Sequence, residues 1–446
     1  MLTRRHLLQG TAALAFAAMG RTAFADDQAN VPIVFVHGDS DLAATWQTQI
    51  WRFESNGYPR EKLFAISFTD PQARTDDTVA QPNRSSTQDQ IRELTAFIED
   101  VKARTGAQKV ALVALSRGGY ATREYAAAHP ESVAAAVLGG TPNHGVFALD
   151  AMLLGSEYNG RGPFLKNLDA GDSEVTAGVP FLTLRSDGFD LYAQSDGGIV
   201  FGKPGMPLNV TSDGPALKGA TNVLLDHVDH RETALGPVAF PLIYKFITGR
   251  EPTRIAILPE AAVTLNGRVT GVVEGTPTNR PVDGAKVEIY KISAETGERQ
   301  GAALLSRTTG ADGVWGPLAT DSATPLEFVV AAPGAPITHI YLSPFPRSFD
   351  KLDLRPAAPA KEDADAAAVI RMDRPRGYFG LPRDIVLLDG KEPADVPHGV
   401  PAVWHTYLRL PTFEDRPIVG EFNEERIVAR PWPAKEGHVT VIELTE

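Results

Sequence analysis

A serine between small neighbours is the first residue of this sequence whose setting suggests chemistry. Ala114-Leu115-Ser116-Arg117-Gly118 overlaps the end of the apolar run 110–115 and precedes the helix-like stretch 119–129. A serine at such a junction lies in a sharp turn, and the residues two before and two after it must be small because strand and helix backbones pass close together. We therefore predict that Ser116 is a nucleophile and that the backbone N–H of Arg117 stabilises an oxyanion. We expect the Arg117 side chain to lie in solvent.

A base for this serine is expected after the last strand of the same unit. The strand-like run 221–225 is followed by Asp226-His227-Val228-Asp229-His230. A serine hydroxyl is a poor nucleophile unless a nearby imidazole takes its proton. We predict His230 as the base, with His227 as the alternative. Ligands so close together on one loop would give a metal ion poor geometry, so we expect no metal site and no cofactor.

A carboxylate that fixes the imidazole tautomer should follow the apolar run 179–184, which gives the chain order Ser, Asp, His. Three candidates follow it: Asp187, Asp190 and Asp196. Ser195-Asp196-Gly197-Gly198-Ile199-Val200 resembles the short turn before an apolar pair in which bacterial lipases often place this residue. We predict Asp196 as the acid. Asp190, before Leu191-Tyr192, is the second candidate and Asp187 the third.

Two further loops complete the predicted site. Val36-His37-Gly38-Asp39-Ser40 ends the first apolar strand and resembles the oxyanion loop of lipases and esterases. We predict the backbone N–H of Asp39 as the second oxyanion donor, and we interpret His37 and Gly38 as structural residues of this loop. Thr141-Pro142-Asn143-His144-Gly145 resembles a turn of many bacterial and archaeal lipases. We assign Asn143 and His144 to shaping the site.

Taken together, residues 31–240 resemble the secreted lipase and esterase branch of the α/β hydrolases. The resemblance implies a mostly parallel sheet with helices on both faces, and the chain supports it with apolar runs that alternate with helical periodicity between 30 and 249. The pattern breaks between 143 and 178, where we predict a cap or lid insertion. The segments 265–269 and 285–290 are similar to prealbumin-like sandwiches. A hydrolase joined to C-terminal β domains resembles archaeal-type lipases whose β domain helps to bind long-chain lipid.

The predicted organisation has four parts. Thr3-Arg4-Arg5-His6-Leu7-Leu8, a short apolar run and Ala23-Phe24-Ala25 predict a twin-arginine signal peptide over 1–25 and a partnership with that export machinery. The catalytic domain follows over 26–252. A β-sandwich is expected over 258–355 and a second small β domain over 362–446. The protein is therefore expected to be periplasmic or extracellular.

Composition narrows the classes of function. The 446 residues carry a net charge of −12, which argues against binding a nucleic-acid backbone. There is no cysteine, which excludes disulfides and a thiol nucleophile. No segment is long and apolar enough to predict a stable membrane span.

These features predict hydrolysis of carboxylic esters through an acyl-enzyme, with a lipid or other apolar acyl ester as substrate. A secreted polyester or polymer hydrolase, acting on an insoluble chain, is the close alternative. A binding protein that retains a hydrolase fold without catalysis is the alternative from another class.

Overall fold

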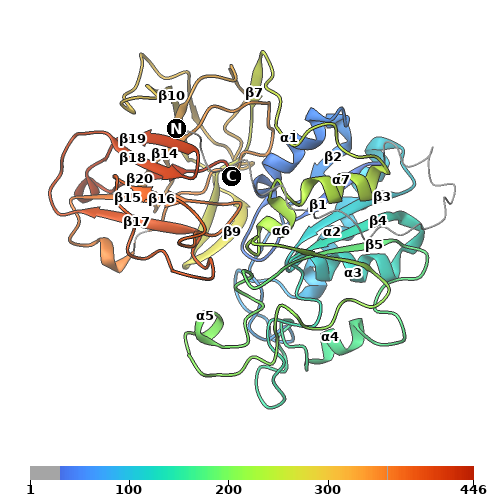
Figure 1. Ribbon diagram of the computed structural model, residues 1–446. Coiled ribbons are helices and arrows are strands. Elements are labelled where there is room, and N and C mark those ends of the chain that lie inside the picture. The colour runs from blue at the N-terminus through green and yellow to red at the C-terminus, as the bar shows by residue number, and fades with distance from the viewer. Residues whose placement is uncertain (1–30, 359) are drawn as a thin grey trace, which may run out of the picture.

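The computed structural model describes residues 31–358 and 360–446 (Figure 1). The predicted signal peptide at 1–25 lies outside the described residues. Within the described part of the chain, none of the helices combines the length and the apolar character that crossing a membrane requires.

The N-terminal part is built on a six-stranded parallel sheet in the order β2-β1-β3-β4-β5-β6. The strands β1, β3 and β4 are buried along their whole length, which explains why their sequences are continuous apolar runs. This confirms the predicted α/β fold. The six strands are β1 (Ile33–Val36), β2 (Leu63–Ala65), β3 (Val110–Leu115), β4 (Val133–Gly139), β5 (Phe181–Ser186) and β6 (Thr221–Leu225).

Helices cover both faces of this sheet. On one face α2 (Thr87–Thr105) and α3 (Gly118–Ala128) pack against alternate residues of the central strands, such as Val34 and Leu112. On the other face α1 (Gln47–Ser55), α6 (Glu232–Leu235) and α7 (Phe240–Thr248) pack against the intervening residues, such as Phe35 and Val113. Successive side chains of a strand point to opposite faces, so each buried strand supplies both cores.

The predicted insertion between 143 and 178 contains one short helix, α4 (Pro163–Leu168), and is otherwise loop. Asn159 is fully buried and orders it: its side chain accepts the N–H of Leu149 at 3.0 Å and donates to the carbonyl oxygens of Leu149 and Met152. A small apolar cluster joins this insertion to the segment around α5 (Gly198–Phe201). Its members are Val146, Phe147, Leu149 and Leu208, with Tyr158, Tyr192, Val200, Phe201 and Met206 packed against them.

The C-terminal half consists mainly of strands, as predicted, and seven of them form one continuous sheet. The order β11-β10-β13-β14-β20-β15-β17 combines strands from both predicted domains, because β14 pairs in parallel with β20, where Ile337 faces His438. The units predicted at 258–355 and 362–446 are therefore not structurally separate, since hydrogen bonds between distant segments close one sheet. Its strands are β10 (Lys286–Lys291), β11 (Leu305–Thr308), β13 (Leu326–Ala331), β14 (Ile337–Leu342), β15 (Ala368–Asp373), β17 (His405–Leu410) and β20 (His438–Glu443).

The other described strands of the C-terminal half form three smaller sheets. They are formed by β7 (Val263–Leu265) with β12 (Leu318–Thr320), by β8 (Thr270–Val273) with β9 (Thr276–Pro281), and by β16 (Val386–Leu388), β18 (Ile418–Phe422) and β19 (Glu425–Ala429).

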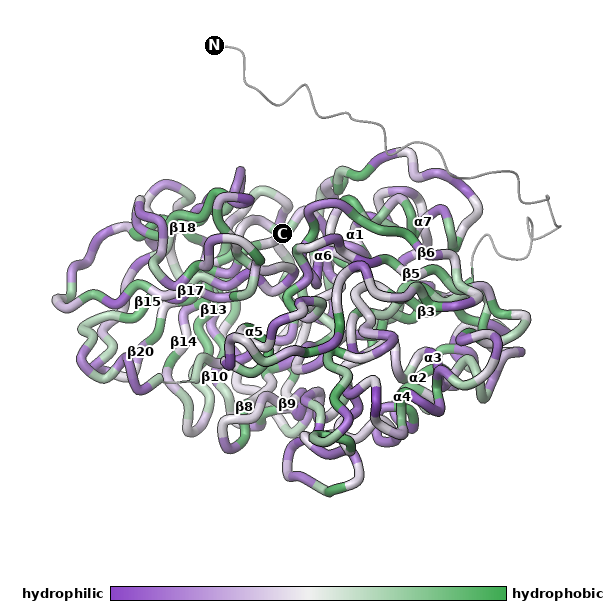
Figure 2. Tube along the Cα trace, turned by 60° about the horizontal axis from the view of Figure 1, so that its bottom comes forward, coloured by the Kyte–Doolittle hydropathy of each residue, from purple (hydrophilic) through white to green (hydrophobic). Residues whose placement is uncertain are grey.

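The two halves share a hydrophobic core. Trp51 of α1 is almost fully buried between Phe345 and Phe349, with ring centroids 6.2 and 6.1 Å away, and its indole N–H donates to the carbonyl oxygen of Ser348 at 3.1 Å. The strands of the C-terminal half lie on one side and the parallel sheet on the other, with α6 at the junction (Figures 1 and 2). The histidine-bearing loop that precedes α6 therefore meets the C-terminal half.

Candidate active site

Ser116 occupies a strained turn between β3 and α3. Its φ of 53° is in the left-handed region, which costs free energy for a residue other than glycine and recurs at functional sites. The Ser116 N–H donates to the carbonyl oxygen of Gly139 at 2.8 Å, which ties the turn to the end of β4. A Cβ atom on Gly118 would lie 2.5 Å from the carbonyl oxygen of His37, so only glycine fits two residues after the serine. The sharp turn predicted from the sequence is present.

His230 is the histidine that the structure brings to this turn. It is buried and packs against Gly140, where an added Cβ atom would lie 3.2 Å from Cε1 of the imidazole. The preceding residue, Gly139, accepts the Ser116 N–H, so His230 lies close to the serine turn. Its Nδ1 lies 2.9 and 2.8 Å from the two carboxylate oxygens of Asp190. The other ring nitrogen, Nε2, is buried and has no hydrogen-bond partner within the described residues. An imidazole held in this way can accept a proton at Nε2.

The carboxylate partner of His230 is therefore Asp190, and the prediction of Asp196 is corrected. Asp196 is exposed and uses its two oxygens to accept the backbone N–H groups of Gly198 and Gly205, which closes its own turn. That turn leads into α5. The sequence pattern around Asp196 thus reflects a local turn, since aspartate commonly accepts nearby backbone N–H groups.

The two remaining candidates pair with each other at the surface. Asp187 accepts the backbone N–H of His227 at 3.0 Å, and its carboxylate lies 3.8 Å from Nδ1 of that histidine. The His227 side chain is 73% exposed, whereas that of His230 is 3% exposed. Only the His230–Asp190 pair lies beside Ser116.

The predicted oxyanion loop lies directly beside the serine. A Cβ on Gly38 would be 3.1 Å from Cβ of Ser116, so the loop approaches closely only because this residue has no side chain. No hydrogen bond among the described residues engages the backbone N–H of Asp39 or of Arg117. The Asp39 carboxylate is fixed by the N–H of Ala73 at 2.7 Å and by the Tyr158 hydroxyl at 3.1 Å.

His37 supports this loop from beneath. Its Nε2 accepts the backbone N–H of Phe68 at 3.0 Å, and its Nδ1 lies 2.8 Å from the carbonyl oxygen of Gly38, to which it donates. Burial lowers the pKa of His37 to about 3, because the charged imidazolium would lose its hydration. His37 is therefore neutral in ordinary buffers and holds the loop as a structural residue.

The Arg117 side chain is buried, contrary to the expectation from sequence. It forms a two-pronged ion pair with Glu157, at 2.5 and 2.8 Å, and donates to Ser85 and to the carbonyl oxygen of Pro71. Both charged groups are nearly inaccessible to solvent, so the pair compensates charges that would be costly alone. It fastens the insertion to the turn that carries Ser116. The local sequence around Arg117 could not reveal this pair, because Glu157 lies 40 residues further along the chain.

Asn143 and His144 lie behind the site. Asn143 is buried against the Arg123 guanidinium, and His144 Nε2 lies 3.1 Å from a carboxylate oxygen of Glu174. Both line a neighbouring cavity of about 400 Å³, whereas the adjacent Pro142 lines the cavity at Ser116 as well. Neither residue lines the cavity at Ser116, so their assignment to shaping the site stays a prediction.

A cavity of about 550 Å³ opens at Ser116 and His230. The insertion and α5 provide an apolar wall of Val146, Phe147, Leu153, Val200 and Phe201. The lining also includes Tyr378, Ala402 and Trp404 from the C-terminal half. No signal in the sequence pointed to these three residues, because they lie more than 140 positions after His230 and reach the cavity only through the packing of the two halves.

Two family models match the chain. Residues 30–140 match the class 2 lipase model, and residues 261–359 match the lipase C-terminal domain model. The matches confirm the resemblance to the lipase and esterase branch of the α/β hydrolases and support a lipolytic hydrolase of carboxylic esters. No curated protein matches the chain significantly.

Several solved structures are similar to about half of the chain. Lipase BlEst2 from Bacillus licheniformis is 22% identical with a TM-score of 0.35, covering 51% of this chain and 96% of its own. The lin2722 product of Listeria innocua is 16% identical with a TM-score of 0.35, covering 51% and 97%. Carboxylesterase CesB from Bacillus subtilis is 15% identical with a TM-score of 0.29, covering 50% and 85%.

Proposed function

We propose that this protein is an exported serine esterase or lipase that cleaves apolar acyl esters through an acyl-enzyme. One observation carries the proposal: Ser116, on a strained turn, lines the same cavity as His230, whose Nδ1 is held by Asp190. A nucleophile, a base with a free ring nitrogen and a carboxylate that fixes the base are the parts that acyl transfer needs.

In the acylation step, Ser116 Oγ attacks the ester carbonyl carbon while His230 Nε2 takes the hydroxyl proton. The Asp190 carboxylate keeps the remaining proton on Nδ1 and stabilises the imidazolium. The backbone N–H groups of Asp39 and Arg117 stabilise the negative charge on the former carbonyl oxygen. The C–O bond to the alcohol then breaks, and His230 returns the proton to the departing alcohol.

Deacylation repeats the sequence with water. His230 Nε2 takes a proton from the water as its oxygen attacks the acyl carbon of the Ser116 ester. The tetrahedral intermediate collapses, the carboxylic acid leaves and Ser116 recovers its proton from His230. No cofactor enters either step.

The apolar side chains at the cavity favour an acyl group over a charged substrate. Phe147, Leu153, Val200, Phe201 and Trp404 all line the cavity. Met152, Leu153 and Leu154 are also exposed at the insertion by 47, 39 and 43%. Burial of an alkyl chain against such side chains contributes about 0.8 kcal/mol per methylene, so esters of medium or long acids are the expected substrates.

The proposal that the protein is exported rests on the sequence alone. The paired arginines, apolar run and Ala-x-Ala of residues 1–25 support passage through the twin-arginine machinery to the periplasm or beyond. Expression with and without these residues, followed by fractionation, tests this part separately from the chemistry.

The first experiment measures hydrolysis of chromogenic acyl esters from acetate to palmitate by the mature protein, Ser116→Ala and Ser195→Ala. Ser195 is an exposed serine beside α5 and serves as the matched control. We expect Ser116→Ala to lose activity by about 10³-fold or more and Ser195→Ala to retain it. A fluorophosphonate should label wild type at Ser116. A folded wild type that hydrolyses none of these esters would contradict the proposal and favour a polymer substrate or a binding protein.

A further inference from the structure

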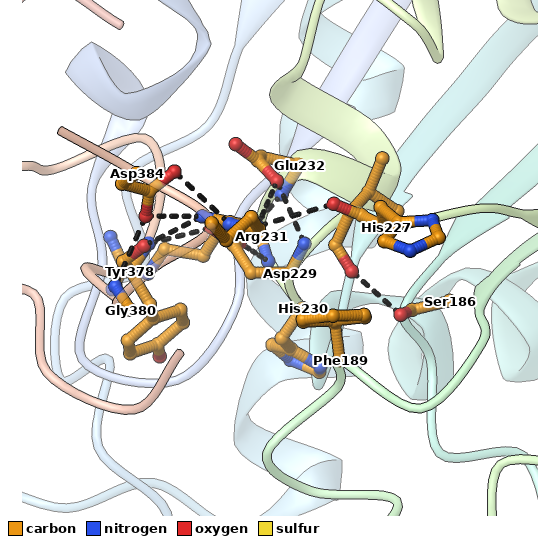
Figure 3. Close-up of polar contacts among 12 residues, drawn as sticks. Ser186, Phe189, His227, Asp229, His230, Arg231, Glu232, Tyr378, Gly380 and Asp384 are labelled. Atoms are coloured by element: carbon orange, nitrogen blue, oxygen red, sulfur yellow. Dashed lines mark hydrogen bonds and ion pairs between the residues drawn. The ribbon is translucent and has the colours of Figure 1, made fainter. Parts of the chain in front are cut away.

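The loop that carries His230 is held by a segment from the other half of the chain. We call residues 226–232 the histidine loop and residues 374–384 the C-terminal segment. The C-terminal segment begins directly after β15, a buried strand of the seven-stranded sheet. Figure 3 shows the histidine loop beside Tyr378, Gly380 and Asp384 of this segment.

Asp229, the neighbour of His230, is the joint between the two. Its Oδ1 accepts the backbone N–H groups of Arg231 and Glu232 at 2.8 and 3.0 Å, which fixes the turn of the histidine loop itself. Its Oδ2 accepts Nη1 of Arg374 and the backbone N–H of Tyr378, each at 2.8 Å. One buried carboxylate therefore couples the backbone on both sides of the domain junction.

The joint is fully buried and contains its own compensating charges. Asp229 has 0% and the Arg374 side chain 4% of their surface exposed. Arg374 also pairs with Glu232, while Arg383 donates to Glu232 at 2.8 Å and approaches Asp229 at 3.3 Å. In this setting ion pairs have strict geometry, because an unpaired charge there would be costly.

The backbone around Arg374 is shaped to receive this side chain. A Cβ on Gly377 would lie 2.1 Å from Nη1 of Arg374, so glycine leaves the room that the guanidinium needs. Arg374 Nη1 also donates to the carbonyl oxygen of Tyr378 at 2.7 Å, and its backbone N–H donates to the carbonyl oxygen of Trp404 at 2.7 Å. The same residue thus connects the histidine loop to two residues that line the cavity.

A second set of hydrogen bonds joins the histidine loop to the C-terminal segment, and it also reaches the end of the predicted oxyanion loop. Arg231 donates to the carbonyl oxygen of Pro375 and, at 2.7 Å, to the carboxylate of Asp41 two residues after Asp39. Asn279 of β9 donates to the backbone carbonyl of Asp41 at 2.9 Å. Side chains of the C-terminal half therefore contact both loops that surround Ser116.

We propose that Arg374 is a positioning residue for catalysis: by clamping Asp229 it holds His230 at the distance and angle that proton transfer from Ser116 requires. The inference rests on the proposed function. Misplacing a catalytic group by about 1 Å can cost about 100-fold in rate, so the C-terminal half contributes to the chemical step as well as to the cavity wall.

The test separates positioning from a role in acyl binding. Arg374→Met should lower kcat by at least about tenfold on the acetate ester, with KM changed less than about threefold, because acetate carries almost no alkyl chain to bury against the apolar lining. The rate of fluorophosphonate labelling at Ser116 should fall to a similar extent. The control is Arg416→Met, which breaks an exposed ion pair with Asp389 in the same half and should leave kcat unchanged.

A double-variant cycle tests whether Arg374 acts through Asp229. Asp229→Asn alone should also lower kcat, and the double variant should lose no more than the stronger single variant, since both changes open one joint. Independent, multiplying losses would overturn the proposed coupling. Arg374→Lys keeps the charge without the fork, and we expect an intermediate kcat. If Arg374→Met does not fold, the kcat of Arg374→Lys serves as the test instead.

Two results have distinct meanings. Wild-type kcat in folded Arg374→Met, or a loss confined to KM of long-chain esters, would overturn the positioning role. Absence of any Ser116-dependent hydrolysis in wild type, judged against Ser116→Ala in the same series, would overturn the proposed function itself.

Discussion

Replacement of Asp190 by asparagine tests the assignment in which structure and sequence pattern differ. Both carboxylate oxygens of Asp190 lie near Nδ1 of His230, at 2.9 Å for Oδ1 and 2.8 Å for Oδ2, and Oδ1 also accepts the backbone N–H of Tyr192 at 2.8 Å. In Asp190→Asn the amide oxygen must stay with the Tyr192 N–H, because two donors cannot face each other. The amide NH₂ then points at Nδ1 and donates to it. The imidazole is forced to carry its proton on Nε2, where it cannot accept one from Ser116.

The expected loss follows from this tautomer reversal. A correctly shaped but wrongly protonated triad costs about 10⁴-fold in kcat in serine proteases, which corresponds to about 5.5 kcal/mol of activation free energy. The buried setting of His230 leaves water little access to restore the tautomer, so we expect about 10³ to 10⁴-fold here. The fold should persist, because asparagine has nearly the shape of aspartate and keeps the Tyr192 bond.

The assay is kcat on a short-chain chromogenic ester for Asp190→Asn beside Asp196→Asn and wild type. Asp196 only closes the exposed turn before α5, so its variant should remain within about fivefold of wild type, in line with the small effect of most surface changes. A nearly inactive Asp196→Asn with a nearly normal Asp190→Asn would contradict the pairing of Asp190 with His230 in catalysis and favour Asp196 as the acid. Circular dichroism of all three proteins checks that the variants are folded.

Three further predictions concern the same site. His230→Gln should reduce kcat by about 10³-fold or more, whereas His227→Gln, at an exposed surface pair, should change it less than about twofold; equal losses would contradict the choice of base. Trp404→Ala should lower kcat/KM for long-chain esters by about tenfold and leave acetate unaffected, and a uniform loss at every chain length would contradict its place in the acyl wall. The third concerns His37, whose pKa is lowered to about 3 by burial. Because the unfolded chain binds a proton at His37 more readily than the folded protein, acid favours unfolding. The contribution of neutral His37 to the free energy of unfolding is complete above the unfolded-state pKa of about 6.5 and is lost as the pH falls toward 3. The advantage of wild type over His37→Gln in unfolding free energy should therefore shrink by about 3 kcal/mol between pH 7 and pH 4, and a constant difference would show that His37 is not held neutral.

Much of the N-terminal fold could be predicted because its signals are local. Strands buried on both faces, such as 110–115, are continuous apolar runs, and Ser116 lies at a junction where only small residues fit beside it. The arrangement of the two C-terminal units was harder to predict, because the pairing of β14 with β20 joins segments 101 residues apart. No local pattern marks such a pairing.

The sequence alone was enough to predict the sharp turn at Ser116, the glycine loop after β1 and the succession of strands and helices along the N-terminal half, because each depends on residues within a few positions of one another. It narrowed the acid to three aspartates, two of which precede an apolar pair, and there it stopped. That Asp190 faces His230 while Asp196 closes its own turn became visible only in the folded protein, because it depends on the path of the chain between β5 and α5. The tertiary structure also decided that Glu157 partners Arg117 and that Arg374 clamps Asp229. Those charges must be compensated where they are buried, and burial is a property of the packed molecule.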